Sequence, residues 1–318
     1  MQTSLSPGFV TRRPTEDDAQ EIHGLVAACD VAAIGAVDTT VEDLADELVE
    51  PDFDLERDGW LVYAGDRLVG WAWACRKGES DNVDIDVYVH PDHPDAAAWM
   101  WDAVERRAAE IAHELGHQQA VVDVGIHAQD AAKRAAADER GYAVATVFYR
   151  MRIDHEGRVE DPELPPGVTL ETADDDDTVR RAAHGVEQGS FAEHFGFVPK
   201  SYDSWLADKE SQSAFDWSQL RLARVDGEPA AMLAGNNQFV PDDNCGYVPT
   251  LATLPGYRGR GLGALLLRDA FARDARAGRL GTYLHVDANN TTPALGLYES
   301  VGMRKVMAIE VWRRTVSA

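Results

Sequence analysis

Apolar and polar residues alternate with two different periods along the second half of the chain. Segments with a period of two predict strands, and longer segments with a period near 3.6 predict amphipathic helices. The predicted strands lie near 168–172, 219–225, 229–239, 246–253, 281–286 and 303–313. The predicted helices lie near 174–187, 201–209, 261–277 and 291–300, and Gly278 follows the third as a C-terminal stop. This order predicts an α/β fold of the α+β kind, in which helices flank a mostly antiparallel mixed sheet.

The first half of the chain shows the same order: strand, two helices, three strands, helix, strand, helix and strand. Its second helix has a capping-box start at Thr40, with Asp43 in place of the usual glutamate. Three pairs of similar segments each lie about 160 residues apart: Gly141–Met151 with Gly302–Trp312, Val89–Pro91 with Thr253–Pro255, and Ala64–Asp66 with Arg224–Asp226. We therefore expect two copies of one domain, over 1–155 and 168–318, joined by a polar, proline-rich linker at 156–167.

The composition narrows the range of partners. The formal net charge is −25, which argues against nucleic acid or an anionic membrane surface as the main partner. It does not argue against a phosphate-bearing ligand, because salt screens charges beyond about 8 Å at physiological ionic strength. We expect no membrane span, since no segment reaches the roughly 20 apolar residues required, and no signal peptide. The oligomeric state is left open.

The three cysteines, Cys29, Cys75 and Cys245, cannot all pair and lack metal-ligand spacing. They suggest a reducing, cytoplasmic setting and no metal site. His90 and His93 share a proline-broken loop without other nearby ligands, so a solvated loop is favoured there too.

A glycine-rich turn at Arg258–Ala264 carries the strongest chemical signal. It follows a strand that ends at Leu251-Ala252-Thr253 and leads into the apolar helix that contains Leu265–Leu267. Glycines allow close backbone approach, and the first N–H groups of a helix attract anions, so the turn predicts a phosphate site. Arg258 and Arg260 add guanidinium groups suited to phosphate. The simpler interpretation is a tight connection between strand and helix.

The turn, the strand before it, and Asn290 and Tyr298 after it together resemble the GNAT superfamily of N-acetyltransferases. The resemblance covers nearly the whole chain as two copies. It implies that the second copy binds acetyl-CoA as co-substrate. The coenzyme-binding residues would be Leu251, Ala252, Thr253, Arg258, Gly259, Arg260, Gly261, Leu262, Gly263, Ala264 and Asn290.

Within this resemblance the loop would hold the pyrophosphate, and the strand would pair with the pantetheine arm and supply N–H groups for the oxyanion. Tyr298 would protonate the departing thiolate, because a phenol with a reference pKa of about 10 is protonated at neutral pH. Taken alone, Tyr298 would be read as an aromatic residue that packs on the sheet, and Asn290 as a helix N-cap.

The two copies differ where the chemistry would lie. In place of the glycine turn the first half has Pro91–Ala98, with prolines, two aspartates and no glycine. Proline removes an N–H donor and aspartate repels phosphate. Ala137 aligns with Tyr298. The first half is therefore expected to be a degenerate, non-catalytic copy.

The acceptor and the general base are less defined. Tyr247 stands where some relatives have glutamate, so no base is assigned; water with Glu187, His184 or His194 is one route. The expected acceptor is the primary amine of a small molecule, and the aromatic loop 189–197 is expected to form part of its site. The tandem order also resembles mycothiol synthases, which acetylate a cysteinyl amine. A non-catalytic acyl-CoA sensor and a dinucleotide-binding fold are the remaining alternatives.

Overall fold

The computed structural model describes residues 5–318 except 158, 175, 193–196 and 290–293. In the first half the elements are β1 (Phe9–Arg12), α1 (Ala19–Ile34), α2 (Val41–Leu48), β2 (Gly59–Ala64), β3 (Arg67–Arg76), β4 (Asn82–Val89), α3 (Ala97–Glu114), β5 (Gln119–His127), α4 (Ala131–Glu139) and β6 (Ala143–Asp154).

The second half repeats this order with one added short helix, α7. Its elements are β7 (Val168–Thr172), α5 (Asp177–Phe191), α6 (Tyr202–Ser211), β8 (Arg221–Val225), β9 (Glu228–Asn236), α7 (Val240–Asp243), β10 (Cys245–Thr253), α8 (Leu262–Arg276), β11 (Gly281–Asp287), α9 (Ala294–Ser300) and β12 (Arg304–Ser317). Short 3-10 turns lie at Glu16–Asp18, Pro94–Ala96, Trp217–Gln219 and Pro255–Tyr257.

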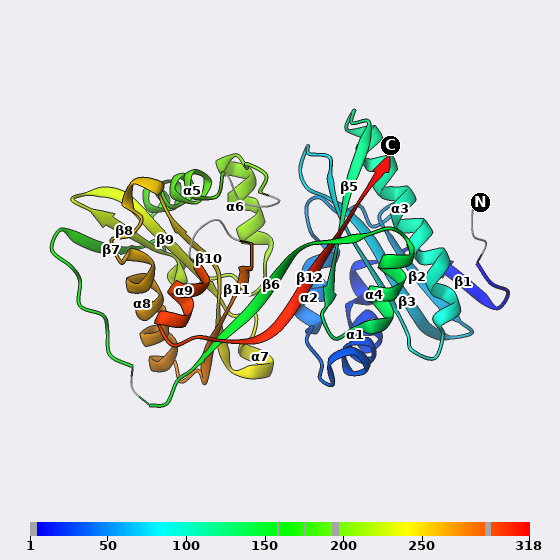
Figure 1. Cartoon of the computed structure of the whole chain (residues 1–318), viewed down its shortest axis with the longest axis horizontal. Coiled ribbons are helices and arrows are strands. Elements are labelled where there is room, and N and C mark those ends of the chain that lie inside the picture. The colour runs from blue at the N-terminus through cyan, green and yellow to red at the C-terminus, as the bar shows by residue number, and fades with distance from the viewer. Residues whose placement is uncertain (1–4, 158, 175, 193–196, 290–293) are drawn as a thin grey trace. The chain divides into compact units, whose positions relative to one another are not determined.

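The last strand of each half joins the sheet of the other half. Residues 309–317 of β12 pair with β5, and residues 148–154 of β6 pair with β11. Contacts therefore divide the chain into unit 1, residues 1–147 with 309–318, and unit 2, residues 148–308. Figure 1 shows green β6 reaching β11 and red β12 running to β5. The two copies predicted from the sequence, 1–155 and 168–318 with a linker at 156–167, describe the order along the chain and stay a prediction.

Each unit has the same strand pairing. In unit 1, β1 to β4 pair as antiparallel neighbours, β4 and β5 are parallel, and β5 and β12 are antiparallel. In unit 2, β7 to β10 are antiparallel neighbours, β10 and β11 are parallel, and β11 and β6 are antiparallel. The expected mixed, mostly antiparallel strand pairing is confirmed, and each unit shows it.

Helices cover both faces of each sheet. In unit 1, α3 contacts β3, β4 and β5, while α1, with α2 beside it, packs on the other face. In unit 2, α8 and α9 lie over one face, and α5 with α6 lies over the other. Each sheet is buried on both sides, so its strands are rich in apolar residues.

Most of the local elements agree with the sequence pattern. Thr40 caps α2 through the capping box with Asp43, and Gly278 follows the end of α8. The pattern missed α7, a single turn between β9 and β10 that carries Asp242 and Asp243. None of the helices in the described ranges is long and apolar enough to cross a membrane.

Trp312 provides a test of the strand exchange. It lies on β12, is 7% exposed and belongs to the core cluster of unit 1. Replacing Trp312 with alanine should lower the free energy of unfolding by about 3–5 kcal/mol, because a large cavity is left in that core. Denaturant unfolding would measure the change. Val306→Ala on the same strand, where Val306 is 39% exposed, should cost only about 0.5 kcal/mol. Equal effects of the two changes would contradict the burial of Trp312 in unit 1.

Candidate functional site

The site begins where the two parallel strands of unit 2 separate. Pairing of β10 with β11 runs from Cys245↔Gly281 to Val248↔Leu284 and then stops. Beyond that point β10 continues beside β9 to Thr253, and β11 continues beside β6 to Asp287. The register of β10 against β9 also shifts between Tyr247 and Thr250. A cavity of about 460 Å³ lies at this opening.

The glycine turn forms one end of the cavity. Gly259 and Gly261 have φ values of +76° and +78°, and Gly261 occupies the N-cap position of α8. An added Cβ at either glycine would meet no atom within 4 Å, so the backbone faces open space. The first N–H groups of α8 lie at this end without intrahelical partners, and the helix dipole favours an anion there. The turn is therefore suited to a phosphate group.

The structure brings most of the predicted coenzyme-binding residues to this one cavity. Its lining includes Leu251, Ala252, Thr253, Arg258, Gly259, Gly261, Leu262, Gly263 and Ala264. Arg260 does not line it; the Arg260 guanidinium lies 5.2 Å from the centroid of the Tyr257 ring. Asn290 lies outside the described residues.

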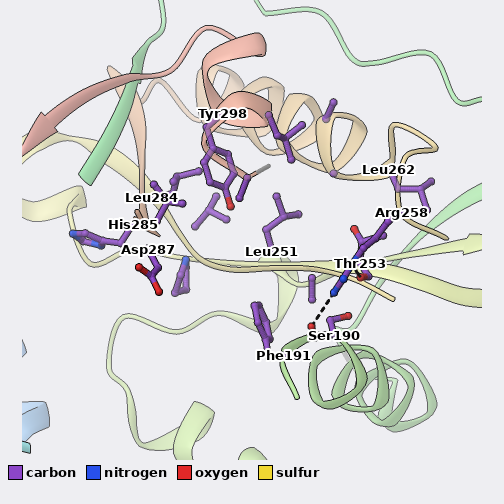
Figure 2. A pocket seen from close by; sticks show the side chains of 18 of the residues that line it. Ser190, Phe191, Leu251, Thr253, Arg258, Leu262, Leu284, His285, Asp287 and Tyr298 are labelled. Atoms are coloured by element: carbon purple, nitrogen blue, oxygen red, sulfur yellow. Dashed lines mark hydrogen bonds between the residues drawn. The ribbon is translucent and has the colours of Figure 1, made fainter. Parts of the chain in front are cut away.

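Arg258 connects two walls of the cavity. Its Nε donates to the carbonyl oxygen of Thr253 at 3.2 Å, and its Nη2 donates to the carbonyl oxygen of Ser190 at 3.1 Å. Thr253 ends β10, whereas Ser190 belongs to the last turn of α5 (Figure 2). The sequence predicted that Arg258 would pair with phosphate. The structure gives its guanidinium an additional role, because these two bonds fix the end of α5 against the end of β10.

Tyr298 lies across the opening from the strands. It belongs to α9, is 8% exposed, and points its ring from that helix toward the cavity (Figure 2). Burial raises the pKa of Tyr298 to about 12, because the phenolate loses solvation in this apolar site. The hydroxyl therefore keeps its proton throughout the neutral and mildly alkaline range.

Ser190 and Phe191 line the cavity, and both come from the loop 189–197 that the sequence associated with the acceptor. Phe148, His285 and Asp287 also line it and were not among the predicted site residues. His285 and Asp287 are on β11, where they alternate with Leu284 and Val286. This alternation could have indicated that they share a face, but the pairing that places them at the opening is not readable from one strand.

The hydrogen bonds of His285 define the tautomer of its neutral ring. Arg150 Nε donates to His285 Nε2 at 3.0 Å, so this ring nitrogen is the acceptor. The proton of the neutral ring is then on Nδ1, which donates to the Tyr247 hydroxyl oxygen at 2.8 Å. Tyr247 is thus part of a chain of hydrogen bonds across β6, β11 and β10.

The base candidates named from the sequence lie away from the cavity or outside the described residues. Glu187 and His184 are not among the residues that line it. His184 Nε2 is 2.9 Å from the carbonyl oxygen of Lys200, while Glu187 has a buried Oε2 without a hydrogen-bond partner in the described structure. His194 is not described.

Unit 1 has the corresponding end of its parallel strand pairing, and side chains of β4 and α4 contact one another just beyond it. Pairing of β4 with β5 stops at Ile85↔Val124. From α4, the Lys133 ammonium pairs with the Asp86 carboxylate and lies 4.6 Å from the centroid of the Tyr88 ring. Ala294, about 160 residues after Lys133, lines the open cavity of unit 2. Burial raises the pKa of Tyr88 well above its usual value, as expected for a phenol packed in this cluster.

The loop that follows β4 also differs from the glycine turn. It contains the 3-10 turn Pro94–Ala96, and residues 91–98 include no glycine. Ala137, the counterpart of Tyr298, is buried in α4. In the part of the chain that the structure describes, no group of three or more His, Cys, Asp or Glu side chains could hold a metal ion.

Comparison with known proteins assigns this architecture to a class. Residues 187–303 match the model of the acetyltransferase (GNAT) family. The fold is that of a GCN5-related N-acetyltransferase from Sphaerobacter thermophilus, with a TM-score of 0.83 at 24% identity over 99% of this chain and 98% of that one. A tandem GNAT protein from the clavulanic acid biosynthesis pathway has a TM-score of 0.74 at 17% identity, covering 96% and 98% of the two chains. The chain therefore has the fold of tandem GNAT proteins, and residues 187–303 of its second half match the GNAT acetyltransferase family.

Two curated relatives are similar in sequence. The mycothiol acetyltransferase of Acidothermus cellulolyticus is 31% identical over 196 residues, and that match covers 56% of this chain and 57% of the relative. The mycothiol acetyltransferase of Salinispora tropica is 26% identical over 256 residues, 76% of each chain. The first match thus spans little more than half of that relative's length.

Gly261 tests whether the glycine turn is the anion site. Gly261→Asp should lower acetyl-CoA affinity on the order of 100-fold or more, because a carboxylate would face the pyrophosphate and a side chain would enter the cradle. Isothermal titration calorimetry would measure this. Gly278→Asp is a matched control, since Gly278 has a φ of +76°, has open space around it, and lies just beyond the other end of α8. The same loss of affinity in both variants would contradict a phosphate site at Gly261.

Proposed function

We propose that unit 2 transfers an acetyl group from acetyl-CoA to the primary amine of a small molecule. The observation that carries this proposal is that a single cavity joins a glycine cradle at a helix N-terminus to the buried hydroxyl of Tyr298. The first feature suits a pyrophosphate and the second suits a proton donor. The opening between β10 and β11 lies between these two ends.

The residues of the cavity fit the coenzyme. Gly259, Gly261 and the first amides of α8 would hold the pyrophosphate, and the open backbone space at these glycines is the observation that favours this fit. Beyond Val248, β10 has no paired residue on β11, so its backbone is available to the amides of an extended pantetheine arm. When bound, acetyl-CoA would supply the acetyl group as a thioester.

Tyr298 would donate a proton to the sulfur of the departing thiolate. Its pKa, raised to about 12 by burial, keeps the phenol protonated at working pH. The phenol is a weaker acid than a thiol, so the transfer depends on position: a donor held beside the sulfur neutralises charge as it develops. The apolar packing around Tyr298, which includes Leu284 and Val286, excludes competing water.

Unit 1 would serve as a structural copy with no acetyl-CoA site of its own. Lys133, Asp86 and Tyr88 are in contact at its strand opening, and the loop at 91–98 has no glycine cradle. The acidic chain, with its net charge of −25, fits a small-molecule acceptor better than a nucleic acid.

A cysteinyl amine is the second candidate acceptor. Support comes from the two relatives that carry the name mycothiol acetyltransferase, one of them 31% identical over its matched segment. A non-catalytic sensor of acetyl-CoA is the competing role, and it would not require the Tyr298 hydroxyl.

Tyr298→Phe separates an enzyme from a sensor. The phenylalanine ring keeps the packing and removes only the hydroxyl, so acetyl-CoA affinity should change little. Turnover with a cysteine-derived or other small primary amine should fall by about 10²–10⁴-fold, the range typical of a lost general acid. Release of the free thiol would measure turnover, and calorimetry would measure affinity.

Tyr149→Phe is the matched control for that change. Tyr149 packs against the same core cluster but does not line the cavity, so its hydroxyl should be dispensable. Because the Tyr298 pKa is about 12, the loss in Tyr298→Phe should be the same at pH 7 and pH 9.5. An unchanged kcat in the variant would contradict the assigned role.

A further inference from the structure

Ser190 is a buried residue whose side-chain hydroxyl makes no hydrogen bond within the part of the chain that the structure describes. It is 5% exposed, and its Oγ has no hydrogen-bond partner in the described structure. It nevertheless lines the cavity of unit 2. A helical serine commonly bonds back to the carbonyl four residues earlier, but Ser190 does not do so. An unpaired buried hydroxyl is unfavourable, so this one is suited to a ligand that fills the cavity.

The position of Ser190 along the cavity is fixed by Arg258. The guanidinium that bonds to the Ser190 carbonyl also bonds to the carbonyl of Thr253, the last residue of β10. Ser190 therefore lies beside the point where the strand ends and the glycine turn is about to begin (Figure 2). Tyr298 belongs to α9, which packs on α8 over the opposite face of the sheet from α5.

A coenzyme that runs through this cavity presents a definite set of polar groups near Ser190. Between its pyrophosphate and its sulfur, coenzyme A carries the pantetheine arm, which has one hydroxyl and two amides. The part of the arm nearest the phosphates must pass the end of β10 if the pyrophosphate occupies the glycine turn. A hydroxyl can donate to an amide carbonyl or accept from an N–H or O–H, so Ser190 matches this chemistry.

We propose that Ser190 is a coenzyme-contacting residue whose hydroxyl bonds to a polar group of the pantetheine arm beside the pyrophosphate. The proposal rests on the proposed function, because it assumes that acetyl-CoA occupies this cavity. Arg258 acts here as a positioning residue, since it presents Ser190 by holding the last turn of α5. Glu187, one turn earlier, also has a buried carboxylate oxygen without a partner in the described structure, but it does not line the cavity.

Ser190→Ala tests the contact with two ligands that share the phosphate end. Calorimetry with acetyl-CoA should show a loss of affinity of about 3- to 10-fold, the size expected for one hydrogen bond. The affinity for 3′-phospho-ADP, which has the phosphates but no pantetheine arm, should not change. The melting temperature of the free protein should stay the same or rise, because alanine removes an unpaired buried hydroxyl.

Ser211→Ala is the matched control. Ser211 ends α6, bonds through its Oγ to the carbonyl of Asp208, and does not line the cavity, so neither ligand should bind differently. Unchanged acetyl-CoA affinity in Ser190→Ala, or an equal loss for both ligands, would overturn the contact. Failure of the unsubstituted protein to bind acetyl-CoA at all would instead overturn the proposed function, so the two failures are distinguishable.

Discussion

The candidate site depends on the separation of β10 and β11. The two strands are paired in parallel at their start, and after Val248 and Leu284 each continues with a different antiparallel neighbour. Because a sheet cannot close such an opening with its own hydrogen bonds, the gap must be filled by side chains or by a ligand. In unit 2 it remains a cavity, with the glycine turn at one end and Tyr298 facing it from α9.

The two units share one strand arrangement but differ at the opening between their parallel strands. Both have the parallel pair that stops early, at Ile85↔Val124 in unit 1 and at Val248↔Leu284 in unit 2. Unit 1 places the Lys133–Asp86 ion pair over Tyr88 at its opening. This cluster gives charged groups local partners in a partly buried place, which a ligand would have to displace. Both units therefore keep the same fold, and under the proposed function these side chains would keep the coenzyme out of unit 1.

Local sequence signals predicted the parts of the site that depend on backbone conformation. Glycines followed by an apolar helix predict the cradle at Gly259 and Gly261, and the strand end at Thr253 follows from the change in hydrophobic period. The exchange of β6 and β12 could not be predicted, because it is decided by pairing with strands that are far away in sequence. The Arg258–Ser190 contact and the Arg150–His285–Tyr247 chain were missed for a related reason: they join segments far apart in sequence.

The central claim is that only the opening in unit 2 accepts the coenzyme, and the number of acetyl-CoA molecules bound per chain tests it most directly. Isothermal titration calorimetry with the full chain should give one site per chain, because the described part of unit 1 has no glycine cradle at residues 91–98 and its opening holds the Lys133–Asp86 pair. Two sites per chain, or no measurable binding, would contradict the account.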